Sequence, residues 1–271
     1  MYSNYKISDC TPEDIPSLKA LWQSSFDDPP ELIDCFFELL PGMGVGLKAE
    51  CGDELVGAVY ILDAEMWIPG RRTEKLGLLY ALAVEPAAGG SGIGSELICA
   101  AKRRCYTHMI SVTCAVPTSP SLYGYFKKCS GIEPVSFYRT EELFPGEDIL
   151  EISEVFEDEY CFSRTDILMK KRVCFVNPDF NYIRYQAERL RSRGGGFYAY
   201  KGGLVCGYIR DGVFVVQEAI DDAPEFIPAL CTRLGVRSAS VRRPAPDGTP
   251  YIAAYPTGDF PSGTVYNLTL E

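Results

Sequence analysis

The sequence predicts an α+β protein made of two tandem domains, each with a mixed, mostly antiparallel sheet flanked by helices. An apolar segment from Leu76 to Val84 runs into a glycine-rich loop and then into an amphipathic helix that reaches Cys105. A similar order of helix, hairpin and third strand recurs in the second half, which indicates a diverged duplication. The 271 residues, 46% of them apolar, suffice for two packed cores. We expect domains at residues 1–144 and 145–271.

Capping residues and apolar periodicity predict the elements of the first half. Thr11 and Ser119 suit the N-cap position, and each precedes a proline at the first helical position. Strands are expected at residues 5–10, 46–50, 55–67, 76–84, 109–116 and 132–139, the last of which closes the domain. Helices are expected to begin at residues 11, 31, 93 and 119, with Pro41-Gly42 ending the second.

The second half repeats this order. A polar, acidic connector over residues 141–166 ends in a helix, and a further helix begins at Asn177-Pro178. The hairpin at residues 197–209 parallels the one at 47–60, with Gly207 in the position of Gly57. Later strands are expected at residues 213–220, 236–242, 251–255 and 264–270, with a helix at about 224–234.

Composition excludes several classes of protein. A net charge of −11 disfavours binding of nucleic acid and favours a cationic partner. The 11 cysteines are scattered without a C-x-x-C pair, and His108 is the sole histidine, so we expect no metal site. Thiols without a secretory leader indicate a reducing, cytoplasmic location. No apolar run of about 18 residues occurs, so we expect no membrane span.

The loop that follows Val84 is suited to binding phosphate. A helix that begins inside a glycine-rich loop directs free backbone N–H groups and its positive dipole end at one point. The spacing of glycines in Gly90–Ser95 does not fit a dinucleotide fold, and no acid lies between Glu96 and Glu133 to bind a ribose. A nucleoside-triphosphate loop would need Gly-Lys-Ser/Thr, which the segment lacks.

Val84-Glu-Pro86 followed by Gly-Gly-Ser-Gly-Ile-Gly-Ser at 89–95 resembles the acyl-CoA loop of the GNAT N-acetyltransferase superfamily, V-x-P-x-x-R-G-x-G-I-G-S. The element order over Tyr5–Arg139 is also similar to that family. The resemblance implies that the strand splays open at Val84 and that the loop cradles the pyrophosphate of acetyl-CoA. The cofactor-binding residues that it implies are Ala83, Val84, Gly89, Gly90, Ser91, Gly92, Ile93, Gly94 and Ser95.

The chain departs from the family pattern at one loop position. Gly89 stands where the family has Arg or Gln, which removes a side-chain contact and leaves the backbone cradle, so cofactor affinity is in question. The basic residues nearby either neutralise CoA phosphates or complement the helix dipole; they are Lys102, Arg103, Arg104, Lys127 and Lys128. At the equivalent turn of the second half, Asp221 and Asp222 would repel a pyrophosphate, so we expect only the first half to bind CoA.

The resemblance implies an acetyl-CoA-dependent N-acetyltransferase that acts by direct attack of a primary amine of a small molecule or peptide, possibly cationic. The second half would shape the acceptor cleft, and the oligomeric state stays open. The alternative is a CoA-binding protein that has lost catalysis. The two hypotheses, an active enzyme and a binding protein, differ in whether residues around the thioester can still act as general acid and base.

Catalysis needs an acid for the CoA thiolate and a base for the ammonium proton. The family often uses the Tyr of Y-x-x-x-G-F as the acid. Here Phe126 falls near that position, with Tyr125 favoured and Tyr123 second. The candidates for the base are Tyr80, which shares strand parity with Leu82 and Val84, then Glu85, Glu65 and a chain of waters. Helical aromatics usually pack in the core, so a purely structural role for the tyrosines is equally open.

Overall fold

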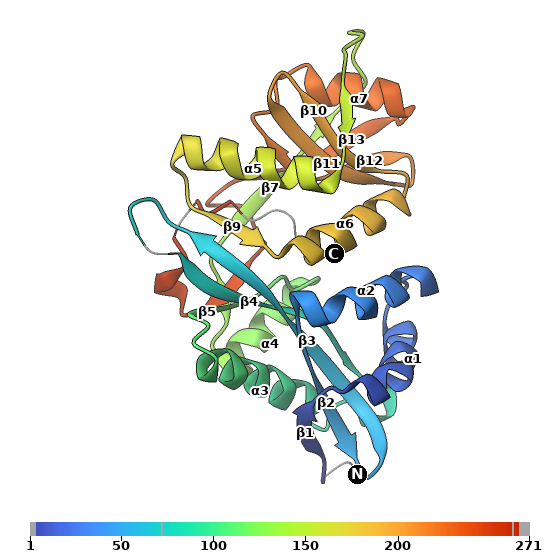
Figure 1. The fold of residues 1–271 in the computed structure, drawn as a ribbon, viewed down its shortest axis with the longest axis vertical. Coiled ribbons are helices and arrows are strands. Elements are labelled where there is room, and N and C mark those ends of the chain that lie inside the picture. Colours follow the sequence, from blue (N-terminus) through green and yellow to red (C-terminus); the bar gives the residue numbers. More distant parts are fainter. Residues whose placement is uncertain (1–3, 72, 262, 266–271) are drawn as a thin grey trace.

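The computed structural model describes residues 4–71, 73–261 and 263–265, which form two sheets stacked along the long axis of the molecule (Figure 1). The strands of the first sheet are β1 (Lys6–Asp9), β2 (Gly44–Cys51), β3 (Glu54–Trp67), β4 (Glu74–Val84), β5 (Val112–Ala115), β6 (Glu133–Pro134), β9 (Phe175–Pro178) and β15 (Ala253–Tyr255). Those of the second are β7 (Phe137–Leu143), β8 (Ser153–Val155), β10 (Gly196–Tyr200), β11 (Gly203–Arg210), β12 (Val213–Ile220), β13 (Ser238–Pro244) and β14 (Thr249–Pro250).

The strand order shows the predicted mixed, mostly antiparallel architecture in both sheets. The first sheet runs β1-β2-β3-β4-β5-β15-β6, with β9 added along β3, and the second runs β14-β7-β13-β12-β11-β10-β8. The neighbours β4/β5 and β12/β13 are parallel, and the other named strand pairs are antiparallel. The predicted fold class is therefore confirmed.

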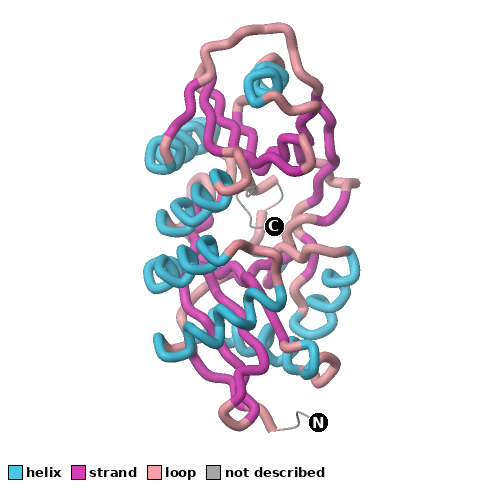
Figure 2. Tube along the Cα trace, turned by 90° about the vertical axis from the view of Figure 1, so that its right-hand side faces the viewer, coloured by secondary structure: helices cyan, strands magenta, loops and turns pink. Residues whose placement is uncertain are grey.

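Helices cover both faces of the first sheet (Figure 2). The seven described helices are α1 (Ile15–Ser25), α2 (Pro30–Met43), α3 (Ile93–Thr107), α4 (Pro120–Ser130), α5 (Glu157–Lys171), α6 (Phe180–Arg191) and α7 (Phe226–Leu234). One face packs against α1 and α2, and α6 continues this layer toward the second sheet. The other face packs against α3 and α4. None of the described helices combines the length and the apolarity that a membrane span requires.

Helix α3 is held close to the sheet by its apolar stripe, as the sequence predicted. Its buried residues are Ile93, Leu97, Ile98, Ala101 and Cys105. Close approach requires a glycine beneath it, because a Cβ at Gly77 would lie 2.8 Å from the sulfur of Cys105. This packing fixes the N-terminus of α3 beside the end of β4.

The two sheets exchange strands, and this corrects one prediction. The expected closing strand at 132–139 splits: β6 joins the first sheet, and β7 leaves it to pair with β13 in the second. The bend lies at Val135 and Ser136, whose N–H groups both donate to the carbonyl of Ile252. Strand β15, from the C-terminal part of the chain, enters the first sheet between β5 and β6. Sheet membership thus does not follow the division at residue 144.

Three element boundaries also differ from the predictions. Helix α2 continues through Pro41 to the fully buried Met43, although Pro41 has no N–H to donate to the carbonyl one turn back. Asn177-Pro178 ends strand β9 instead of starting a helix, and α6 is capped by the Asp179 carboxylate, which accepts from the N–H of Asn181 at 2.7 Å. Strand β5 is shorter than expected, and most of the strand expected at 264–270 lies outside the described residues.

Candidate active site

Strands β4 and β5 diverge in the middle of the first sheet. They pair from Leu76 with Val112 to Leu79 with Ala115, and beyond Leu79 strand β4 has no partner on that side. The divergence coincides with a bulge: Ala81 has a φ of 45°, and the register against β3 shifts at this point. Splaying therefore begins nearer the middle of β4 than at Val84.

The bulge reverses which side chains of β4 face which helices. Tyr80 packs with Trp22 and Phe36 on the α1/α2 face, at ring-centroid distances of 5.8 and 5.6 Å. After the bulge, Leu82 and Val84 pack on the α3/α4 face. The expectation that Tyr80 shares a face with Leu82 and Val84 is therefore wrong, because an extra residue in the strand shifts the two-residue alternation.

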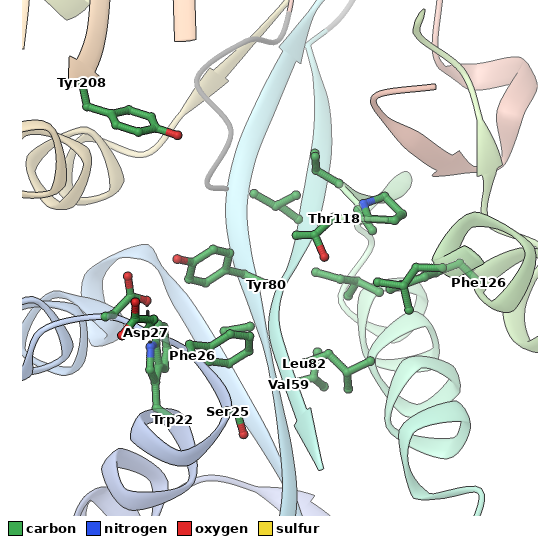
Figure 3. Close-up of a pocket in the computed structure, with 18 of the residues that line it drawn as sticks. Trp22, Ser25, Phe26, Asp27, Val59, Tyr80, Leu82, Thr118, Phe126 and Tyr208 are labelled. Atoms are coloured by element: carbon green, nitrogen blue, oxygen red, sulfur yellow. Dashed lines mark hydrogen bonds between the residues drawn. The ribbon is translucent and has the colours of Figure 1, made fainter. Parts of the chain in front are cut away.

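A pocket of about 880 Å³ opens where the two strands separate. Figure 3 shows Tyr80 and Phe126 entering it from opposite sides of β4, with Thr118 between them. Both domains build its wall. The polar or aromatic lining residues are Trp22, Ser25, Phe26, Asp27, Asp28, Tyr80, Thr118, Phe126, Arg193, Tyr208, Arg210 and Asp211. The last four come from the second half, from the residues that follow α6 and from the β11–β12 hairpin.

The predicted anion cradle forms at the start of α3. A short 3-10 turn (Pro86–Ala88) leads into Gly90 and Gly92, whose φ values of 74° and 90° favour glycine. The first α-helical hydrogen bond at this end joins the N–H of Glu96 to the carbonyl of Gly92. The N–H groups of Ile93, Gly94 and Ser95 precede it, so they have no carbonyl one turn back within the helix.

Not every loop residue predicted to bind cofactor offers its backbone to a ligand. The N–H groups of Gly89 and Ser91 donate within the loop, to the carbonyls of Pro86 and Ala88 at 3.1 and 3.3 Å. The hydroxyl of Ser91 also turns inward and donates to the carbonyl of Ala88 at 2.5 Å. These two residues shape the loop, while Gly90 and Gly92–Ser95 form its open face.

The aromatic residues of α4 point to three different places. Phe126 lines the pocket and is 6% exposed, so the position nearest the family's Tyr carries no hydroxyl group here. The Tyr125 hydroxyl accepts a hydrogen bond from Ser95 Oγ at 3.0 Å, beside the cradle. The Tyr123 hydroxyl contacts the carbonyl oxygens of Pro250 and Tyr251 at 2.9 and 2.8 Å. Neither Tyr125 nor Tyr123 lines the pocket.

The carboxylates considered as bases lie away from the pocket. Glu85 stands at the start of the turn before the cradle, and its N–H donates to the carbonyl of Val56. Glu65 lines a separate groove of about 550 Å³, which also receives His108. The carboxylates on the pocket are instead Asp27 and Asp28, between α1 and α2, and Asp211, in the β11–β12 hairpin. The sequence marked the segment of Asp27 and Asp28 only as a helix break, because nothing in it indicates which cavity it faces.

Asp28 and Tyr80 are the most strongly held polar groups of the pocket. Asp28 accepts from Trp22 Nε1 at 3.1 Å and from the Arg193 guanidinium at 3.4 Å, while Asp27 is exposed. The Tyr80 hydroxyl lies 3.5 Å from that of Tyr185. Burial raises the pKa of Tyr80 to about 12, so its hydroxyl keeps its proton at neutral pH.

Of the five basic residues considered for the CoA phosphates, three have partners within the protein. Lys102 donates to the carbonyl of Ser130 at 2.5 Å and lies over the Tyr255 ring. Arg104 pairs with Asp9 at 3.1 Å, and Lys127 with Glu133 at 3.2 Å. Arg103 and Lys128 are exposed. The backbone of the cradle, more than this basic group, provides the attraction for an anion.

The equivalent region of the second domain is closed. Asp222 is clamped by the Arg243 guanidinium at 2.9 and 2.7 Å, and Asp221 pairs with Lys171. On the neighbouring β12, Glu218 is fully buried. Two ion-paired carboxylates thus stand at the turn that would have to hold a phosphate. Among the described residues, no three His, Cys, Asp or Glu side chains gather as metal ligands.

Comparison with known proteins identifies the first domain. Residues 6–127 match the family model described as an acetyltransferase (GNAT) domain. No curated protein sequence matches the chain. Among solved structures, a probable N-acyltransferase of Enterococcus faecalis has a TM-score of 0.72 at 16% identity, over 93% of this chain and 72% of that one. A GCN5-related N-acetyltransferase of Kribbella flavida has a TM-score of 0.68 at 16% identity, over 93% and 70%.

A second GCN5-related N-acetyltransferase, from Anabaena variabilis, has a TM-score of 0.67 at 12% identity, over 93% of this chain and 72% of that one. These alignments extend over both domains, so the two-sheet fold as a whole is shared. The family match, over residues 6–127, includes the strand, loop and helix that build the cradle. Residues 6–127 thus match a GNAT acetyltransferase domain, and the chain as a whole shares its fold with these solved structures.

Proposed function

We propose that this protein is an acetyl-CoA-dependent N-acetyltransferase that acts on a primary amine of a small molecule or peptide. The observation that carries the proposal is the pocket at the divergence of β4 and β5, which β4 connects directly to the cradle. The pyrophosphate would lie on the N–H groups of Gly92–Ser95. Pantetheine would follow the uncovered edge of β4, and the thioester would reach the pocket beside Leu82.

The acceptor would approach from the side that both domains line. Its amine nitrogen attacks the thioester carbon, the C–N bond forms, the C–S bond breaks, and CoA leaves as a thiolate that takes up a proton. The ammonium proton passes to solvent or to the exposed carboxylate of Asp27. Tyr80 remains protonated and donates a hydrogen bond on the acceptor side.

A cationic amine suits this side of the pocket. Trp22, Phe26 and Tyr208 supply aromatic rings, and Asp27 and Asp211 supply carboxylates near the opening. Arg193 forms an ion pair with Asp28. The remaining charged residues are two carboxylates, Asp27 and Asp211, and one cation, Arg210, so this side of the pocket has a net negative charge. All 11 cysteines are free thiols, which supports a reducing, cytoplasmic location for the reaction.

The test is release of CoA from acetyl-CoA with a panel of polyamines, aminoglycosides, amino acids and short peptides. We expect amine-dependent release, with acetylated product by mass spectrometry. Asp27→Asn should raise KM for the cationic acceptors several-fold, whereas Asp53→Asn, in the exposed β2–β3 turn, should change nothing. Absence of turnover with every amine, despite CoA binding, would reject the enzymatic proposal.

One observation favours the alternative, a CoA-binding protein without catalysis. Phe126 occupies the place in the pocket where the family often has a Tyr, so no α4 hydroxyl faces the thioester. Phe126→Tyr distinguishes the two functions. If protonation of the thiolate limits a working enzyme, this variant gains kcat, whereas a purely binding protein gains no turnover from it.

A further inference from the structure

The cradle has few side chains with which to bind the cofactor. Gly89 offers none, and the hydroxyl of Ser91 is turned back onto the carbonyl of Ala88. The hydroxyl groups that remain beside the first turn of α3 are those of Ser95 and Tyr125, which are hydrogen bonded to each other. This pair joins α3 to α4 at the point where the cradle meets the end of β4.

The Tyr125 hydroxyl lies against the first turn of α3, beside Ser95 and Gly94. Ser95 Oγ donates to it at 3.0 Å. A Cβ built on Gly94 would lie 2.8 Å from the same hydroxyl and 3.6 Å from a methyl group of Val84. The phenol therefore stands over the first turn of α3, on the side of β4, and Gly94 leaves the room that it occupies.

The hydrogen-bond arrangement leaves the phenolic proton available. Ser95 donates to Tyr125, so the Tyr125 oxygen acts as the acceptor, and no other described residue accepts its own proton. A half-buried hydroxyl that has a proton to donate and lies beside the first-turn N–H groups of α3 is suited to donate to a phosphate, because anionic oxygens accept from several donors at once. The absence of Tyr125 from the pocket argues against contact with the thioester.

We propose that Tyr125 is a cofactor-binding residue that donates to the pyrophosphate of CoA, with Ser95 holding it in place. It supplies the side-chain contact that Gly89 does not, and it is not the acid that protonates the thiolate. The inference rests on the proposed use of acetyl-CoA. The sequence favoured Tyr125 as the catalytic acid, and this inference makes it a cofactor-binding residue instead.

The test is the dissociation constant for CoA of Tyr125→Phe, by calorimetry, with pantetheine as a second probe that lacks the phosphates. A lost hydrogen bond to a charged group predicts about tenfold weaker binding of CoA. Pantetheine at millimolar concentration should bind Tyr125→Phe as well as it binds the original protein. Ser95→Ala should weaken CoA binding in the same direction but less. Tyr106→Phe, an exposed position near the far end of α3, is the matched control and should bind CoA like the original protein.

Kinetics separate this role from that of a catalytic acid. At saturating acetyl-CoA, Tyr125→Phe should keep its kcat and the pH dependence of kcat, with KM for acetyl-CoA raised. Unchanged CoA affinity together with a kcat loss of a hundredfold or more would overturn the inference, as would equal losses for CoA and pantetheine. Because binding is read without turnover, failure of this inference is distinguishable from failure of the proposed function, in which the original protein would acetylate no amine.

Discussion

The hydroxyl oxygen of Tyr123 lies 2.8 Å from the carbonyl oxygen of Tyr251. This contact joins α4 of the first domain to the segment that enters β15, the strand inserted between β5 and β6. The hydroxyl also contacts the carbonyl of Pro250. The first sheet is therefore completed by residues near the end of the described chain, and both domains share its stability.

Tyr123→Phe should therefore destabilise the whole protein without removing a catalytic group. Loss of a hydrogen bond of this kind costs about 1 kcal/mol. Urea unfolding should show a lower midpoint in one transition for both domains. Tyr106→Phe, whose ring is 83% exposed, is the control. A midpoint equal to that of the control would contradict the role assigned to Tyr123.

Gly92→Ala should weaken acetyl-CoA binding, because alanine disfavours the φ of 90° that begins α3. We expect a cost of about 1 kcal/mol in stability and at least a tenfold loss of affinity as the helix start shifts. Gly52→Ala is the matched control, since Gly52 also has a positive φ, 64°, with open space around it in the β2–β3 turn. That variant should lose similar stability but no affinity. Equal affinity in the two variants would rule out the cradle.

The second domain depends on a buried ion pair. Arg164 and Glu218 are 0% and 1% exposed and share two hydrogen bonds of 2.9 and 3.1 Å, with the Tyr160 hydroxyl donating to the same carboxylate. Arg164→Met should cost about 3–5 kcal/mol, because it leaves the carboxylate buried and unpaired. Lys170→Ala, which breaks the exposed pair with Asp166, should cost less than about 0.5 kcal/mol. If chemical denaturation shows similar losses in the free energy of unfolding for Arg164→Met and Lys170→Ala, this ranking is contradicted.

Tyr80 gives a prediction about alkaline pH. Burial raises its pKa from 10 in the unfolded chain to about 12, so the folded state holds the proton more tightly. The associated stability is complete below pH 10 and is lost as pH rises through about 12. Tyr80→Phe should therefore lose less free energy of unfolding between pH 9 and 12, by up to about 2 kcal/mol. The pH–rate profile between pH 6 and 9 should show no inflection that this variant removes; such an inflection would indicate that Tyr80 acts as a base.

The sequence predicted the elements that follow local rules. Ser119 and the periodic residues of α3 depend on neighbours within one or two turns, so α3 and α4 begin where expected. Thr11 caps a 3-10 turn at Pro12–Asp14, and α1 begins only after it, at Ile15. Gly90 and Gly92 were recognisable because backbone conformation at a loop favours glycine. The fold class followed from the order of these elements and from their repetition in the second half.

The exchange of strands was not predictable in the same way. Nothing in the residues of β7 or β15 specifies which sheet they join, because that choice depends on partners about 100 or more residues away. The bulge at Ala81 was also missed, and with it the face on which Tyr80 lies. A single inserted residue changes side-chain parity without altering the apolar composition of the strand. Asp27 and Arg210 could not be assigned to the pocket from sequence, because only the long-range packing of the chain brings them to one cavity.

The most direct measurement is titration of the protein with acetyl-CoA by calorimetry. An open cradle at Gly90–Ser95, and a second-domain turn filled by Asp222 and Arg243, predict one bound molecule per chain. Gly92→Ala should weaken that binding, and Asp222→Asn should leave it unchanged. Two molecules bound per chain, or binding that survives intact in Gly92→Ala, would contradict the assignment of the acyl-CoA site to the first domain.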